Sequence, residues 1–528
     1  MNPITSALYK NRKPVLRVLA ALFMVLLVLI VLQTMTLHQY NVLELALRDP
    51  PVGRPQDQLT TPQRLSAVRL AMAHAWGGYA KHAFGGDELK PLSQTGSGGT
   101  QLGATIIGAL DTLWIMNMGD EFDQARAWVQ DHFDPNADTE VGFSETSAQL
   151  LGGLLSAYKL SGDRMFLNKA RLLGENLINT TNRETGLPYS VVNLNPETRR
   201  NAERKDGTST LSDAGSVQLD LVYLATATGE KKFAEAAFRM FDTVSKGNLD
   251  SEGMLASLLD PTTGTCSGAF EMSRYFDNLL KMWIFLGGDG NPTAIEYRKS
   301  YDKTVKSMHK YLFRKMTSSV TSSSQNDFTT VVSYGENGVE GKTMKADSCY
   351  AAGMLALGAT VHNATRAQSP RSERDMEAAR GIARACYEMH ARSPVFMAPE
   401  LVNVGDKFFA QKKWTSKLRF ETVETLFYLW RITHDARYRE WGWNIFMGME
   451  KYSKVPGGGY SGIKDVQDGG EVVEDDLQPA WLTAGTLKYL YLLFTQDDVL
   501  PLDRFVFNAN GHPYPIQEYL YLKINGED

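Results

Sequence analysis

The chain has 528 residues, of which 43% are hydrophobic and 22% charged, which excludes a disordered or collagen-like chain and provides apolar material for a large core. Lysine and arginine number 55 against 60 aspartate and glutamate residues, and this mild acidity argues against a general nucleic-acid binder, which needs a concentrated positive surface. Three cysteines exclude a disulfide-dense scaffold and a four-cysteine zinc site, and leave room for one disulfide.

The N-terminal segment predicts a membrane anchor. Residues 18–32 contain no polar side chain, and with its flanks the apolar stretch covers 15–35, about the 20 residues that a helix needs to span a bilayer. The positive-inside rule makes 1–14 a cytosolic tail and gives a type II topology, because basic residues precede the span at Lys10, Arg12, Lys13 and Arg17. The alternative, a cleaved signal peptide, also leaves the rest of the chain lumenal or secreted.

The segment after the anchor, 36–61, is rich in proline and predicts an extended stem. Farther along, two N-glycosylation triplets begin at Asn179 and Asn363. Such triplets arise often by chance, but they fit a glycosylating lumen.

One pattern recurs through the rest of the chain: an apolar helical run, rich in leucine and aromatic residues, closed by a polar turn that usually ends in an acid. A glycine in such a turn ends one helix, and the acid caps the next. The intervals leave room for two helices each, which predicts an all-α fold, an (α/α)7 toroid of seven helical hairpins over 62–516, followed by a tail at 517–528. A chance recurrence of leucine-rich helix ends is the alternative. The turns end at Asp120, Asp163, Glu230, Asp289, Asn363, Asp435 and Asp498.

Carboxylates that precede the inner helices of such a toroid are candidates for an active site, because the loops at one end of these helices converge on the axis. These candidates are Asp111, Glu145, Glu400, Glu421 and Glu424. A glutamate in the first turn of a helix more often only caps it or offsets its dipole, but several around one pocket suit glycoside hydrolysis, which uses one protonated and one ionised carboxyl group. Aromatic residues that could stack on sugars, although core packing is their commoner role, are Trp76, Trp114, Trp414 and Tyr428.

Ordered motifs such as ALDTLWIM, ETSAQLLGGLLSAYKLSGD, FETVETLFYLWRITHDARYREWGW and GTLKYLYLLF resemble the class I α-1,2-mannosidases, glycoside hydrolase family 47. The resemblance runs from about Pro62 to Ile516. It implies an (α/α)7 barrel, inverting hydrolysis of α-1,2-linked mannose on N-glycans, a calcium ion, and a type II protein of the Golgi or endoplasmic reticulum membrane. It also implies a disulfide between Cys349 and Cys386, with Cys266 left as a free thiol.

The resemblance also assigns roles to the candidate carboxylates. Glu145 corresponds to the glutamate of the family motif F-E-T-x-I-R and Glu400 to that of A-P-E, and we predict these two as the catalytic pair. Arg419 and Glu421 correspond to R-P-E, and we predict that they bind substrate, together with Asp111 and Glu424.

Several family positions carry other residues here. The calcium-binding threonine of N-T-E-A-H-P is Ala509, and because calcium takes six to eight oxygen ligands, we expect binding to be weak or absent. The aspartate of D-S-Y-Y-E-Y-L-L-K falls at Met272 or Ser273. Other replacements are Ala346 for the histidine of H-L-x-C-F, Gln149 for the arginine of F-E-T-x-I-R, Gly108 for the first aspartate of D-A-L-D-T, and Pro479 and Gly485 for two glutamates of M-E-S-F-F-L-A-E.

The sequence therefore predicts a mannosidase-like hydrolase that acts on mannose-rich N-glycans or glycoproteins. Two alternatives stay open at this point. One is a lectin-like glycoprotein binder that has lost catalysis. The other is a barrel whose surviving glutamates perform acid catalysis on a substrate that is not a glycan.

Overall fold

The computed structural model describes residues 59–195, 201–202, 207–247, 253–316, 328–335, 338–360, 369–404, 411–467 and 472–516. The chain divides into two units, Met1–Asp57 and Gln58–Asp528, and every described residue belongs to the second. The predicted tail, anchor and nearly all of the stem, together with Asn363 and the tail at 517–528, lie outside the described residues. None of the helices in the described ranges is both long and apolar enough to cross a membrane.

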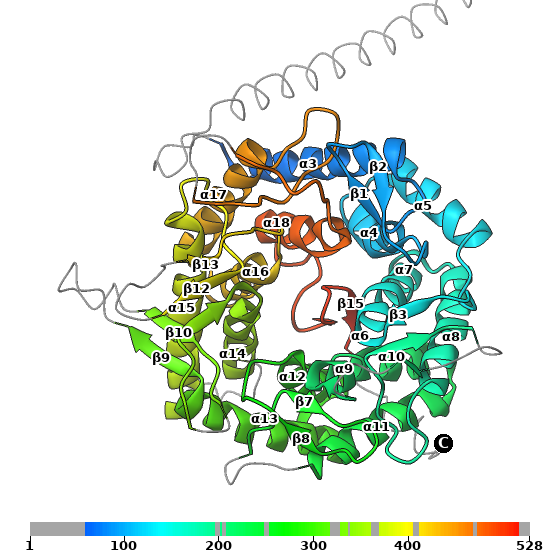
Figure 1. Ribbon diagram of the computed structural model, residues 1–528, viewed down its shortest axis with the longest axis vertical. Helices are drawn as coiled ribbons and strands as arrows, with labels where there is room; N and C mark the ends of the chain where they lie inside the picture. Colours follow the sequence, from blue (N-terminus) through cyan, green and yellow to red (C-terminus); the bar gives the residue numbers. More distant parts are fainter. Residues whose placement is uncertain are drawn as a thin grey trace, which may run out of the picture. The chain divides into compact units, whose positions relative to one another are not determined.

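The second unit is a ring of paired helices (Figure 1). Each inner helix packs mainly against one outer helix, and α3 (Thr61–His82), the first described helix, packs against α18 (Leu487–Phe494), the last described one. The prediction of a mostly helical fold of paired helices is therefore confirmed, but the turn at Asp498 leads into the short strands β14 (Phe505–Phe507) and β15 (Pro513–Pro515), so among the described residues α18 pairs with α3 and not with a following helix. The pairs within the described part of the chain are α4 (Ala104–Ile115) with α5 (Gly119–Asp131), α7 (Gly152–Ser161) with α8 (Arg164–Asn179), α10 (Gln218–Thr228) with α11 (Lys231–Ser245), α12 (Arg274–Phe285) with α13 (Pro292–Tyr311), α14 (Tyr350–Thr360) with α15 (Pro370–Ala391), α16 (Glu421–Thr433) with α17 (Arg437–Tyr452), and α18 (Leu487–Phe494) with α3 (Thr61–His82).

Hydrophobic patterning explains which helix of each pair lies inside. In α14 every residue from Tyr350 to Ala359 is buried, as expected for a helix that is apolar all round. Its partner α15 buries only one face, with exposed charged residues on the other. A helix with a single apolar stripe covers the ring from outside, whereas a uniformly apolar helix must be enclosed.

The turns between paired helices behave partly as the sequence predicts. Gly162 ends α7 in the left-handed conformation, with φ 75°, and the Asp163 side chain then accepts a hydrogen bond from the backbone N–H of Met165. Glu230 follows Gly229 in the same way but makes no capping hydrogen bond. Its carboxylate pairs instead with Arg171, at 2.5 Å. The acid at the turn is thus a cap in one copy and an ion-pair partner in another.

Short antiparallel strands lie in the connections between helices. Sequence patterning did not predict them, because runs of two to four residues are too short to show alternation. The hairpin β14–β15 pairs Val506 with Tyr514 and lies inside the ring (Figure 1). The strand pairs are β1 (Glu88–Lys90) with β2 (Thr95–Ser97), β4 (Val191–Asn193) with β3 (Glu140–Gly142) and β5 (Asn201–Ala202), β7 (Leu258–Leu259) with β6 (Ser209–Thr210) and β8 (Cys266–Ser267), β9 (Phe313–Met316) with β10 (Phe328–Val331), β12 (Leu401–Asn403) with β11 (Thr343–Lys345) and β13 (Gln411–Lys413), and β14 (Phe505–Phe507) with β15 (Pro513–Pro515).

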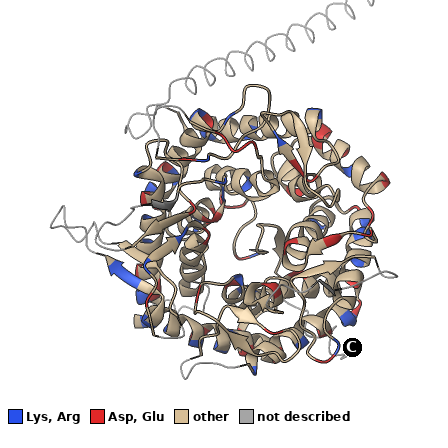
Figure 2. Ribbon diagram, in the orientation of Figure 1, with Lys and Arg blue, Asp and Glu red and all other residues tan. Residues whose placement is uncertain are grey.

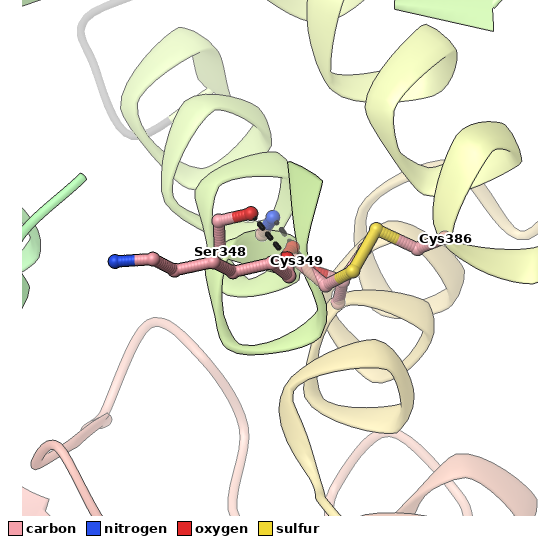
Figure 3. Close-up of a disulfide and its surroundings, with 6 residues drawn as sticks. Ser348, Cys349 and Cys386 are labelled. Carbon is pink, nitrogen blue, oxygen red and sulfur yellow. Dashed lines mark hydrogen bonds between the residues drawn. A yellow bond between two sulfur atoms is a disulfide. The ribbon is translucent and has the colours of Figure 1, made fainter. Parts of the chain in front are cut away.

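A disulfide joins the two helices of one pair. Cys349 lies immediately before α14 and Cys386 lies in α15, with an S–S distance of 2.06 Å and a Cα–Cα distance of 6.0 Å (Figure 3). This is the bridge that the family resemblance implies. Cys266 is buried and carries a free thiol.

Candidate active site

The N-terminal ends of several inner helices meet at a cavity of about 390 Å³. Arg274, Tyr350 and Glu421 are the first residues of α12, α14 and α16, and all three line it. Glu145 reaches it from the loop end before α7, and Ala509 from the loop of the β14–β15 hairpin. Charged residues therefore occur on the inner ring as well as on the outer one (Figure 2). The expectation that these helix ends converge is fulfilled, and the convergence builds a polar pocket.

Glu145 is the last residue of a short helix, α6 (Phe143–Glu145), and directly precedes a π-helix, η1 (Thr146–Leu151). Such π-helical turns occur frequently at functional sites because they re-aim side chains. Desolvation raises the pKa of the Glu145 carboxyl, and the negative charge of Asp87 raises it further. Both influences favour the protonated acid.

Glu421 lines the same cavity and is only 7% exposed. Its Oε2 atom has no hydrogen-bond partner in the described structure, and its Oε1 atom lies 3.7 Å from an Arg419 nitrogen. Desolvation raises the pKa of Glu421 to about 7, while Arg419 and Arg274 act in the opposite direction. The carboxyl group therefore titrates near neutral pH with one oxygen available to a ligand.

Glu400, by contrast, does not line this cavity. Arg419 Nε donates to both carboxylate oxygens, at 3.0 and 2.8 Å, and a second guanidinium nitrogen lies 2.8 Å from Oε2. Glu400 borders a separate small pocket of about 30 Å³ that shares Arg419 with the main cavity. The structure thus places Glu145 and Glu400, the predicted catalytic pair, at different pockets, and the catalytic role of Glu400 stays a prediction.

Asp111 also lies away from the cavity. Its side chain is fully buried between Lys488 and His512, each at 2.8 Å. Desolvation alone would raise the pKa of Asp111, but these two partners outweigh it and hold the pKa at about 2. The geometry gives Asp111 a supporting role beneath the site, joining α4, α18 and the loop of the hairpin.

Glu424, the remaining predicted carboxylate, is 2% exposed and is held by Arg274. One guanidinium nitrogen donates to Glu424 Oε2 at 2.9 Å and the other to Oε1 at 3.2 Å, and the latter also lies 3.5 Å from Asp277. Sequence reasoning missed Arg274. A signal was nevertheless present, because a cation in the first turn of a helix opposes the helix dipole and requires a compensating partner.

The aromatic lining also differs from expectation. Tyr350, Phe420 and Trp481 line the cavity, and the indole Nε1 of Trp481 donates to the Lys417 carbonyl at 3.1 Å. None of the four aromatic residues proposed from the sequence does so: Trp76 and Tyr428 are buried in the core, and Trp114 and Trp414 lie at the surface, 43% and 44% exposed. Trp481 directly precedes a second π-helix, η5 (Leu482–Thr486), in the segment where the family has aromatic residues.

The residues around this cavity do not fit calcium. The described residues contain no group of three or more histidine, cysteine, aspartate or glutamate side chains placed to hold a metal. Ala509 offers no hydroxyl. A Cβ atom at Gly485, where the family has a glutamate, would lie 2.9 Å from the Phe420 ring, so this ring occupies the space that an acidic side chain needs.

Residues 71–516 match the model of glycosyl hydrolase family 47. The human mannosyl-oligosaccharide 1,2-alpha-mannosidase IB is 34% identical over 90% of this chain and 73% of its own length. The mannosidase MNS1 of Arabidopsis thaliana is 37% identical over 88% and 80%, and the mouse endoplasmic reticulum mannosyl-oligosaccharide 1,2-alpha-mannosidase is 35% identical over 86% and 68%. The solved α-1,2-mannosidase from Trichoderma reesei shares the fold, with a TM-score of 0.75 at 22% identity over 86% of this chain and 99% of its own.

Proposed function

The chain belongs to glycosyl hydrolase family 47, and we propose that it hydrolyses α-1,2-linked mannose on mannose-rich N-glycans of the secretory pathway. The observation that supports this most is the pair Glu145 and Glu421. Both glutamates line one cavity, both have a raised pKa, and glycoside hydrolysis requires two carboxyl groups that flank a sugar. Named relatives act as mannosyl-oligosaccharide 1,2-alpha-mannosidases, which supports the substrate class.

We assign Glu145 as the general acid, because desolvation and Asp87 both favour its protonated form. It donates a proton to the glycosidic oxygen as the bond from that oxygen to the sugar carbon breaks. We assign Glu421 as the general base: desolvation raises its pKa to about 7, the guanidinium groups of Arg419 and Arg274 limit that rise, and the carboxyl group is therefore ionised above neutral pH. It accepts a proton from the water that attacks the same carbon from the opposite face, so configuration inverts.

Glu421 is preferred to Glu400 as the base for two reasons. The two Glu400 oxygens already accept hydrogen bonds from Arg419, so Glu400 would have to give up part of this contact to reach an attacking water. The main cavity also does not include Glu400. Glu400 instead holds the guanidinium of Arg419, which in turn faces Glu421.

The proposed rate depends on pH in a defined direction. Glu421 must be ionised to act as base, and its pKa lies at about 7, so kcat/KM should rise with pH through about 7. Glu145 must be protonated to act as acid, and desolvation and the negative charge of Asp87 both raise its pKa, so the rate should fall where Glu145 loses its proton. Trp481, Phe420 and Tyr350 supply aromatic surface for sugar binding.

We also propose the finer architecture and location. The described helix pairs, closed by α3 against α18, support an (α/α)7 barrel over about 62–516. The apolar segment 15–35 supports a type II anchor in the Golgi or endoplasmic reticulum membrane, with the barrel in the lumen. A disulfide between Cys349 and Cys386 and the exposed Asn179 of a glycosylation triplet fit that compartment.

Glycan profiling tests the proposal. Full-length protein purified in mild detergent is incubated with a high-mannose N-glycan, and the products are separated by mass. Wild type should remove mannose, and Glu145→Gln should lower the rate by ~10² or more while glycan binding persists, because the amide keeps the shape but cannot donate the proton. Glu296→Gln is the matched control, since Glu296 lies on an exposed face of α13 and is 59% exposed.

The two alternatives give different results in the same experiment. Binding of the glycan without release of mannose by wild type would favour the lectin-like protein. Neither binding nor release would favour a barrel with another substrate. Equal rates for wild type and Glu145→Gln would remove Glu145 from the mechanism.

A further inference from the structure

We infer that Arg274 supplies, as a fixed side chain, the positive charge at the floor of the cavity, so that this site works without a divalent cation. The inference rests on the proposed hydrolysis and adds the identity of the group that balances charge there. It follows from the observation that the side chains around the cavity do not supply the oxygen ligands that calcium needs.

Arg274 lines the cavity and already contacts two buried carboxylates, those of Glu424 and Asp277, that are not part of the lining. Its two guanidinium nitrogens donate to the two oxygens of Glu424, at 2.9 and 3.2 Å. Asp277, the other carboxylate in reach, lies 2.6 Å from the Lys281 ammonium. A bidentate guanidinium–carboxylate pair is among the strongest charged contacts in proteins. A calcium ion would have to displace it to obtain these oxygens.

Several residues that differ from the family motifs lie in contact with one another around Arg274. The Arg274 guanidinium lies over the Tyr350 ring at 4.0 Å and over the Phe420 ring at 5.6 Å, so two aromatic faces hold the cation. Tyr350 falls at the final phenylalanine of the family motif H-L-x-C-F, and Phe420 falls at the proline of the family motif R-P-E. Counting back from Lys281 along D-S-Y-Y-E-Y-L-L-K puts Arg274 at the serine. Gly485 completes the set, because its missing side chain makes room for the Phe420 ring.

The hairpin loop lacks the hydroxyl ligand of the family, and the single side-chain amide that it adds to the cavity lining, that of Asn510, falls far short of the six to eight oxygens that calcium takes. Ala509 has none in its side chain, and Asn508 is fully engaged. Its amide nitrogen donates to the Ala148 carbonyl at 2.8 Å and to Asp220 at 2.9 Å, and its amide oxygen accepts from the backbone N–H groups of Asn510 and His512, each at 3.0 Å. Using this oxygen for a metal would leave two backbone donors unsatisfied, a buried one at His512 and a partly buried one at Asn510.

Arg274 thereby acts as a positioning residue for the proposed base. The charged groups that face Glu421 are Arg274 on α12, Arg419 on the segment before α16, and Asp347 on η4 (Ala346–Cys349). The two cations outweigh the single carboxylate and oppose the desolvation that raises the pKa of Glu421, so they favour its ionised form. Loss of Arg274 should therefore move the acidic limb of the kcat/KM profile to higher pH.

The first experiment measures metal dependence on the wild-type, full-length protein. Thermal melts and calcium titration calorimetry are run after treatment with chelator and again in millimolar calcium. We expect an unchanged melting temperature and no binding heat. A saturated calcium site would raise the melting temperature by about 2–3 °C, and such a rise, or mannose release that chelator abolishes and calcium restores, would overturn the inference.

The second experiment tests the charge itself. Arg274→Met should lower kcat/KM by ~10² and move the acidic limb upward, whereas Arg274→Lys should keep the limb near its wild-type position because it keeps the charge. If Arg274→Met fails to fold because Glu424 is left unpaired, the double variant Arg274→Met/Glu424→Gln removes both charges. An unmoved acidic limb in a folded variant that lacks the cation would contradict the role of Arg274.

The two proposals can fail separately. If wild type releases no mannose under any condition, the proposed hydrolysis fails, and the calcium titration still decides whether the site binds the metal. If wild type releases mannose only with calcium, the hydrolysis stands and the inference about Arg274 falls.

Discussion

Removing the disulfide gives the prediction with the best-defined magnitude. The bridge between Cys349 and Cys386 closes a loop of sequence separation 37, and the chain-entropy model assigns such a loop ~4 kcal/mol of stabilisation at 25 °C. The unit Gln58–Asp528 has about 470 residues, and at about 2.1 cal/mol/K per residue its unfolding entropy is ~1 kcal/mol/K. Cys349→Ala/Cys386→Ala should therefore lower the melting temperature by ~4 °C, plus the packing loss of two buried sulfur atoms.

The assay is thermal unfolding followed by circular dichroism on full-length variants. Cys266→Ala is the matched control, because Cys266 is buried but unbridged, so it reports the cost of losing a thiol alone. The excess of the double variant over twice this control is the contribution of the crosslink. If the melting temperature of the double variant falls by no more than about 1 °C beyond twice the shift of the control, the bridge does not restrain the unfolded chain as the model assumes.

Two further predictions concern close packing and buried charge. A Cβ atom on Gly153 would lie 2.4 Å from the backbone oxygen of Ile107, whereas one on Gly77 has nothing within 4 Å. In urea melts Gly153→Ala should therefore lose ~1–3 kcal/mol of stability, and Gly77→Ala should gain up to ~1 kcal/mol. Equal effects of the two substitutions would contradict the close approach of α7 to α4. Burial raises the pKa of Asp220 from 3.8 to about 7, so the folded state keeps a proton that the unfolded chain releases, and this contribution to stability falls as pH rises from about 4 to about 7. Asp220→Asn should shrink the difference between urea midpoints at pH 5 and pH 8, and an undiminished difference would place the titrating group elsewhere.

The fold could be predicted from the sequence because its helix pairs are marked by patterns within short stretches of the chain. The apolar runs and polar turns located helix pairs because glycine ends a helix and a short acid caps the next within a few residues, as Gly162 and Asp163 do. The family motifs gave the disulfide and the candidate Glu145, but they paired Glu145 with Glu400 and assigned Glu421 only to substrate binding. Short strands were missed, since their pairing depends on neighbours far away in the chain.

Non-local contacts limited the prediction of the site. Glu424 pairs with Arg274 across 150 residues, and Asp111 meets Lys488 and His512 across 377 and 401 residues. No single-sequence spacing reveals such partners. Because these contacts decide which carboxylates are neutralised, the sequence alone could not separate Glu421, which faces the cavity, from carboxylates whose charge is already balanced.

The central claim is that Glu145 and Glu421 hydrolyse an α-mannoside with inversion. Proton NMR of the full-length protein acting on α-1,2-linked mannobiose tests it most directly, because the anomeric signal of newly released mannose appears before mutarotation. We expect β-mannose as the first product of the wild type, and a rate at least ~10² lower for both Glu145→Gln and Glu421→Gln. Release of α-mannose first, or undiminished release by either variant, would contradict it.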